Sequence, residues 1–184
     1  NLALIGATIV SIIYGVTFTI AKDVMPLYID SYGFILLRAG GSMILFWMVW
    51  LFMPKEKIVF SDFPRIIGAA FFGVAFNMLT FFKGLSLTSP ISAAVIMVST
   101  PMIVLALSAI IMKERMKSRM IFGIILGLIG TGFLILYGKS IGSATNAGLG
   151  NFLVLVNAIS YGFYLIIVKK LMDKYNAFTF VKWI

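Results

Sequence analysis

Six long apolar segments constrain the fold more than any other feature of the sequence. Each is long enough to cross about 30 Å of hydrocarbon as an α-helix rising about 1.5 Å per residue. Backbone groups must form their hydrogen bonds internally in lipid, so long segments with short loops favour a helical bundle. The predicted spans are Leu2–Ala21, Tyr32–Met53, Ile66–Leu85, Ile91–Met112, Met120–Tyr137 and Leu149–Val168. A seventh starts at Phe178, and we expect the chain to be a fragment of a longer protein.

The composition agrees with an all-α polytopic membrane protein and disfavours most enzyme chemistry. Hydrophobic residues make up 61% of the chain and charged residues 11%. With six acidic residues, no histidine and no cysteine, little is available for catalysis, a metal site or a thiol nucleophile. We therefore expect neither an enzyme nor a bound metal or cofactor. The net charge of +9 lies in clusters between apolar segments, which indicates membrane topology rather than nucleic-acid binding.

The basic residues alternate between the two sides of the predicted membrane. Ten of them follow spans two, four and six, whereas the other loops and span ends carry Lys22, Lys83 and Lys139. The positive-inside rule then places the N-terminus and the even loops, with Lys57, Lys117 and Lys170, in the cytoplasm. We expect a multi-pass protein of the cell membrane, that is, the inner or plasma membrane.

The two ends of the chain show a weak internal similarity. At an offset of 147 residues, eight of 37 overlapping positions are identical, among them Tyr14/Tyr161 and Gly15/Gly162. Five spans separate the copies, so span six runs opposite to span one, as in the inverted repeats of many secondary transporters. Five helices per repeat predict about ten transmembrane helices in the full protein.

The stretch from Gly84 to Gly132 resembles the EamA domain of the drug/metabolite transporter superfamily. Small residues open a helix that holds Pro101 and ends at Glu114, and a glycine-rich helix with Gly123, Gly127 and Gly130 follows. Arg38 matches a basic position in the second helix of that family.

The resemblance implies a carrier built from inverted five-helix repeats, with residues 1–140 as the first repeat and residues 148–184 as the start of the second. It also implies a secondary transporter, most often an exporter of small metabolites or drugs that works by alternating access. A non-transporting membrane scaffold and a small-multidrug-resistance-like exporter remain alternatives. The second of these relies on a Glu in the first helix, which span one lacks.

Polar and aromatic side chains recur at helical spacing on four spans and predict a shared cavity that binds a small-molecule solute. These stripes are Ser11, Tyr14 and Phe18; Asn77, Thr80 and Phe81; Ser92 and Ser99; and Asn157, Ser160, Tyr161 and Tyr164. Interhelical hydrogen bonding is the alternative for single members. The predicted solute-binding residues are Tyr14, Arg38, Asn77, Ser99, Asn157, Tyr161 and Tyr164.

Arg38 is the deepest charge in the predicted spans. It can extend to the outer interface or pair with Asp23 or Asp30, and these are structural interpretations. Alternatively its planar guanidinium faces the cavity and binds an anionic group of the solute. Both remain open at the level of sequence.

The remaining intramembrane features have mainly structural interpretations. Pro101 removes one backbone hydrogen bond and predicts a kink near Met97. Gly123 and Gly127 form a GxxxG motif, which predicts close helix packing and leaves a homodimer possible. Glu114 lies among basic residues, where an interfacial ion pair is expected.

Overall fold

The computed structural model describes residues 2–25, 27–53, 56–113, 117–137 and 146–184. Within these ranges all regular secondary structure is helical. The helices are α1 (Leu2–Val24), α2 (Ser31–Leu51), η1 (Phe60–Asp62), α3 (Phe63–Ala70), η2 (Phe71–Ala75), α4 (Phe76–Leu87), α5 (Pro90–Val98), α6 (Thr100–Met112), α7 (Ser118–Tyr137), α8 (Ala147–Met172) and α9 (Ala177–Val181). The all-α polytopic fold predicted from the apolar segments is confirmed.

Each predicted span corresponds to one helix or to a pair of helices in line. The third is α3 and α4 joined by η2, and the fourth is α5 and α6 joined at Ser99. Five described segments are long and apolar enough to cross a membrane, and they comprise Leu4–Val24, Ser31–Leu51, Phe60–Leu87, Pro90–Ile111 and Ala147–Met172. The apolar stretch Ser118–Phe133 of α7 is shorter than these five segments.

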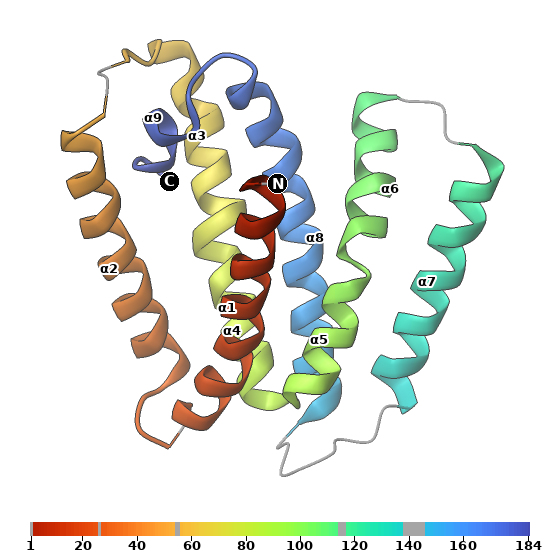
Figure 1. The fold of residues 1–184 in the computed structure, drawn as a ribbon. Helices are drawn as coiled ribbons and strands as arrows, with labels where there is room; N and C mark the ends of the chain where they lie inside the picture. The colour runs from red at the N-terminus through yellow and green to blue at the C-terminus, as the bar shows by residue number, and fades with distance from the viewer. Residues whose placement is uncertain (1, 26, 54–55, 114–116, 138–145) are drawn as a thin grey trace.

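Successive crossings run in alternating directions, as Figure 1 shows. Helices α2, α6 and α8 end, and η1, α7 and α9 begin, at one end of the bundle. Helices α1, α4 and α7 end, and α2, α5 and α8 begin, at the opposite end, and α8 therefore runs antiparallel to α1 (Figure 1). An inverted repeat requires this direction. However, the sixth crossing of any protein with alternating crossings runs antiparallel to the first, so the repeat and its boundaries stay a prediction.

Helix α8 forms the centre of the bundle and packs most closely against α4. The two backbones meet at Gly84 and Gly150. An added Cβ at Gly150 would lie 2.8 Å from the carbonyl oxygen of Gly84, which leaves room only for hydrogen there. Nearby, the Thr88 hydroxyl donates to Asn151 Oδ1 at 2.6 Å. Small residues allow such close contact in lipid, where no hydrophobic effect drives helices together.

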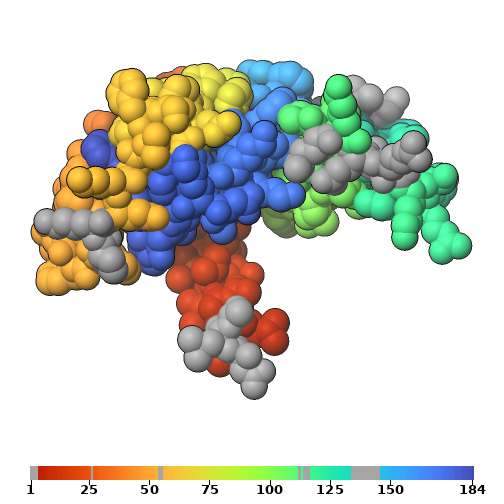
Figure 2. All heavy atoms as spheres, turned by 90° about the horizontal axis from the view of Figure 1, so that it is seen from above, coloured from red at the N-terminus to blue at the C-terminus, as the bar shows by residue number. Residues whose placement is uncertain are grey.

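Helix α1 lies apart from this centre. Viewed from above, its N-terminal half projects from the arc formed by the other helices (Figure 2). Its contacts with α4 and α5 are few, and the buried side chains described at its C-terminal end are Phe18 and Ala21, followed by Met25 directly after the helix. Lys22, near that end, donates to the carbonyl oxygens of Leu85 and Ser86 at 3.0 and 2.8 Å. A cation bonded to the last carbonyls of α4 stabilises that helix end.

Polar contacts join the start of the third crossing to the turn after α8. Asp62 accepts hydrogen bonds from Lys174 and from the Tyr175 hydroxyl, and it forms an ion pair with Arg65 at 2.9 Å. The hydrogen bond to Asp62 raises the pKa of Lys174 above its usual range. Glu56 accepts from the Thr179 hydroxyl at 2.7 Å. Two crossings far apart in the sequence are thus joined at one end of the bundle.

The glycines of α7 have different surroundings. Met102 of α6 packs against Gly127, as expected for a packing glycine. A Cβ added at Gly123 or Gly130 would meet nothing within 4 Å. A dimer contact at these two glycines stays a prediction. Glu114 and Lys139 lie outside the described residues.

Candidate functional site

A cavity of about 850 Å³ lies between α1, α2, α4, α6 and α8. It is near the middle of the crossings, because Tyr14 is halfway along α1 and Asn157 is close to the middle of α8. Aromatic and aliphatic side chains form most of the wall. The polar and charged lining residues are Tyr14, Thr17, Arg38, Asn77, Thr100, Ser108, Asn157 and Tyr161.

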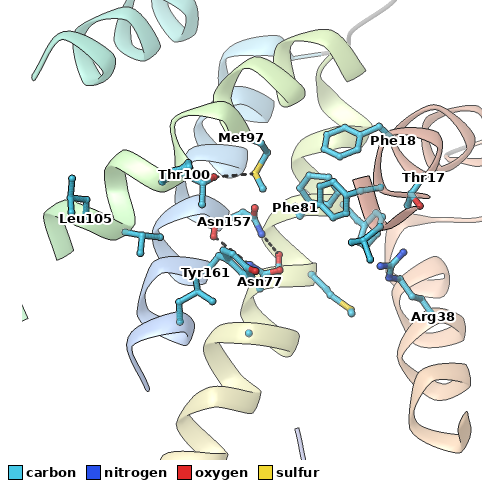
Figure 3. A pocket seen from close by; sticks show the side chains of 18 of the residues that line it. Thr17, Phe18, Arg38, Asn77, Phe81, Met97, Thr100, Leu105, Asn157 and Tyr161 are labelled. Carbon is cyan, nitrogen blue, oxygen red and sulfur yellow. Dashed lines mark hydrogen bonds between the residues drawn. The ribbon is translucent and has the colours of Figure 1, made fainter. Parts of the chain in front are cut away.

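Five of the seven predicted solute-binding residues line this cavity: Tyr14, Arg38, Asn77, Asn157 and Tyr161. They come from four crossings, and Figure 3 shows Arg38 entering from α2 and Asn157 from α8 on the opposite side. The structure thus gathers side chains that are up to 147 positions apart in the sequence. Their role in binding a solute stays a prediction.

Ser99 and Tyr164 do not line the cavity. The Ser99 hydroxyl donates to the Ile96 carbonyl at 2.6 Å, so its polar group is engaged at the junction of α5 and α6. The Tyr164 ring instead packs against Gly73, where an added Cβ would clash with the ring. Both residues therefore have contacts outside the cavity, although helical spacing placed them on the predicted stripes.

The other stripe residues divide in the same way. Phe18 and Phe81 line the cavity, with their ring centroids 5.1 Å apart in an edge-to-face contact. Ser11 lines a smaller neighbouring cavity of about 550 Å³. The Ser160 hydroxyl donates to the Phe72 oxygen across helices, which is the alternative considered from the sequence, whereas the hydroxyls of Thr80 and Ser92 make hydrogen bonds within their own segments.

Asn77 and Asn157 join α4 to α8 at the cavity wall. Asn157 Nδ2 donates to the backbone oxygen of Asn77 at 2.9 Å, and Asn77 Nδ2 donates to the backbone oxygen of Asn157 at 3.4 Å (Figure 3). Asn157 is 2% exposed, and its Oδ1 has no hydrogen-bond partner among the described residues. Leaving a buried amide oxygen unbonded costs free energy, so this atom has an unused capacity to accept a hydrogen bond.

A π-helical turn in the third crossing helps to form the wall. The Phe76 N–H bonds to the Phe71 oxygen, five residues back, and the Ser160 hydroxyl donates to the Phe72 oxygen at 2.7 Å. The extra residue in this turn changes the face that the following helix presents, and Asn77 comes directly after it. Gly73 within the turn and Asn77 shortly after it both line the cavity. No sequence signal predicted this turn.

A break in the fourth crossing lies on the facing wall. Helix α5 ends at Val98, and α6 begins at Thr100, with Pro101 in its first turn. The kink predicted from Pro101 is therefore present, one to two residues before the proline. Thr100, Val104 and Ser108 then line the cavity at steps of four residues. Thr100 and Ser108, and also Thr17 three residues after Tyr14, follow the helical spacing but were not among the predicted cavity residues. Single hydroxyl residues are common in membrane helices, so they did not stand out in the sequence.

Arg38 lies about 10 Å along α2 from its first residue, at 1.5 Å per residue. Its guanidinium carbon is 5.6 Å from the centroid of the Phe82 ring, a cation–π contact. The ion pairs found among the described residues both involve Asp62. The predicted alternative of a pair with Asp23 or Asp30 is therefore wrong for this structure, and the guanidinium lines the cavity.

The chain also matches known proteins. The EamA-like transporter family matches residues 1–136. The chain belongs to this family. An uncharacterized transporter from Archaeoglobus fulgidus is 29% identical over 125 residues, which cover 67% of this chain and 43% of that protein. This EamA-like chain thus spans less than half the length of that relative. No solved structure matches the present chain significantly.

Membership of the family agrees with the resemblance seen in the sequence and points to a membrane transporter rather than an enzyme. Among the described residues, no group of three or more acidic, histidine or cysteine side chains is placed to hold a metal ion. The described residues provide the cavity with one guanidinium, two amides, hydroxyl groups and aromatic faces.

Proposed function

We propose that the protein is a secondary carrier that exports small metabolites or drugs across the cell membrane by alternating access. The observation that carries this proposal is the partly polar cavity near the middle of the crossings. Transporters place the solute near the bilayer midplane, between helices whose regular bonding is interrupted. Here Asn77 follows a π-helical turn, and Thr100 follows a helix break.

The two helix irregularities also support a moving carrier. A crossing that is divided into two short helices can change the angle between them at lower cost than a continuous helix. Thr100 and Pro101 at the break both line the cavity, as does Gly73 in the π-helical turn. Changes at either position would therefore alter access to the solute directly.

The decisive experiment is solute flux in liposomes that contain the purified full-length protein. We expect time-dependent, gradient-driven loss of one or more compounds from a metabolite library. Asn157→Leu is expected to reduce the initial rate at least about tenfold, since it removes a hydrogen bond between α4 and α8 and the free Oδ1. Thr8→Val is the control, because Thr8 is exposed and bonds to its own helix. A folded protein that moves no solute under any gradient would favour a scaffold.

The same observations support a small-multidrug-resistance-like exporter less well. A small-multidrug-resistance-like exporter relies on a Glu in its first helix, and α1 has none. The charged side chain among the described lining residues is Arg38, with no carboxylate beside it. The cavity thus lacks, in the described chain, the acidic group with which such exporters exchange a cation for protons.

We further propose that the N-terminus and the loops after the even-numbered spans face the cytoplasm. The basic residues support this orientation through the positive-inside rule. Single cysteines can report it, because the chain contains none. A membrane-impermeant thiol reagent added to intact cells should label Lys22→Cys and Lys139→Cys and spare Lys57→Cys, Lys117→Cys and Lys170→Cys. Labelling of position 57 or 117 with no labelling of 139 would reverse the assignment.

A further inference from the structure

The cavity has an uneven distribution of charge. Arg38 is the charged side chain among the described residues that line it, and the rest of the polar lining is amide, hydroxyl or phenol. A guanidinium stays protonated at every physiological pH. The described wall therefore carries one permanent positive charge and no negative charge.

The guanidinium is also available to a ligand. Arg65 and Lys174 pair with Asp62, and Lys22 donates to two backbone oxygens. Arg38, in contrast, is exposed and contacts the Phe82 ring without an ion pair or hydrogen bond among the described residues. Its five N–H donors are in the planar arrangement that binds a carboxylate through two parallel hydrogen bonds.

A second polar group points to a ligand independently. Asn157 Oδ1 is buried and has no hydrogen-bond partner in the part of the chain that the structure describes, and Asn157 belongs to the cavity wall opposite α2 (Figure 3). An amide oxygen accepts a hydrogen bond from a neutral O–H or N–H group. Between the two groups the wall is aromatic, with Phe18 and Phe81 packed edge to face. This surface favours a flat apolar body in the ligand.

From this arrangement we propose that the solute is an organic monoanion with a flat apolar body and no ammonium group. This inference rests on the proposed function and specifies its substrate class. An ammonium in the cavity would lose its hydration without a carboxylate to offset the loss, and Arg38 would repel it. Aromatic faces bind cations, but the Phe82 ring is already in contact with the Arg38 guanidinium.

Three probes that share a phenyl ring test the charge preference. They are 3-phenylpropionate, a monoanion; phenylalanine, a zwitterion; and 2-phenylethylamine, a cation. Binding of each to the purified full-length protein is measured by calorimetric titration in detergent. We expect 3-phenylpropionate to bind at least about tenfold more tightly than either of the others, as a charge-assisted hydrogen bond provides. Equal or tighter binding of the cation or the zwitterion, or no binding of the monoanion, would overturn the inference.

Variants of Arg38 test the residue itself. Arg38→Gln should lower the affinity for 3-phenylpropionate at least about tenfold and leave that for 2-phenylethylamine unchanged or higher. Arg38→Lys keeps the charge and should retain the order of the three probes with weaker binding, because ammonium cannot donate in the same planar manner. Arg119→Gln, which removes an exposed guanidinium at the start of α7, is the matched control and should bind as the unchanged protein does.

Folded yield and flux separate the possible outcomes. If Arg38→Gln does not fold, the probe order in the unchanged protein and in Arg38→Lys still decides the inference. Binding of the monoanion without flux in liposomes would support the charge preference and overturn the transport proposal. Flux of 2-phenylethylamine in preference to the monoanion would support transport and overturn the charge preference.

Discussion

Helix α1 and the α4–α8 pair are similar in composition but differ in how they are held. Thr8, Ser11 and Thr17 of α1 donate to backbone oxygens four residues earlier in their own helix. In the α4–α8 pair, hydrogen bonds cross between helices, as from Thr88 to Asn151 and from Asn157 to Asn77. Small residues explain the difference, because Gly84 and Gly150 let these two backbones come close enough for side chains to reach across.

A polar residue in a membrane helix therefore does not by itself indicate an interhelical contact. Hydroxyl side chains satisfy themselves within their own helix when no neighbour is near. Gly6 and Gly15 of α1 have nothing within 4 Å of an added Cβ, so these glycines do not form a contact among the described residues. The comparison predicts that substitutions will be costly at the α4–α8 crossing and mild in α1.

The largest effect is expected for Gly150→Ala. The added Cβ would lie 2.8 Å from two backbone atoms, the Gly84 oxygen and the Thr88 nitrogen, which cannot move aside as a side chain can. We expect a loss of about 3 kcal/mol or more in unfolding free energy, measured by denaturant titration in mixed micelles. Gly148→Ala, two residues earlier with open space around it, is the control and should be neutral or slightly stabilising. Equal effects of the two changes would contradict the close crossing.

A smaller effect is expected for Thr88→Val. This change removes the donor to Asn151 Oδ1, and Asn151 Nδ2 already lacks a partner, so a whole amide would be buried without hydrogen bonds. The cost should be about 1–2 kcal/mol in the same titration. Thr8→Val, which removes a hydrogen bond within exposed α1, should cost less than about 0.5 kcal/mol. A larger loss of unfolding free energy for Thr8→Val than for Thr88→Val would contradict the difference between α1 and the α4–α8 pair.

The smallest effect tests how α1 is attached. Phe18 is 8% exposed and meets Phe81 edge to face, with ring centroids 5.1 Å apart. Phe18→Leu should cost about 0.5–1.5 kcal/mol, the value of such an aromatic pair beyond its buried area. Phe122→Leu on exposed α7 is the matched change and should cost almost nothing. No difference between them would mean that the aromatic contact does not hold α1.

The sequence alone was enough to predict the crossings, the alternation of their directions and the transporter family. These properties depend on hydrophobicity summed over about 20 residues, which is local along the chain. Pro101 also predicted the break in the fourth crossing, since a missing N–H is a local defect. Helical spacing placed Tyr14, Asn77 and Tyr161 on faces that do line the cavity.

Only the tertiary structure decided which members of each stripe share the cavity. The π-helical turn before Asn77 and the junction at Ser99 redirect the faces that follow them, and neither the turn nor the packing of the Tyr164 ring against Gly73 has a local sequence signal. The position of Arg38 over Phe82 likewise depends on how closely α2 approaches α4. Such contacts arise from packing between segments distant in sequence, where a glycine or one extra residue in a turn changes which side chains meet.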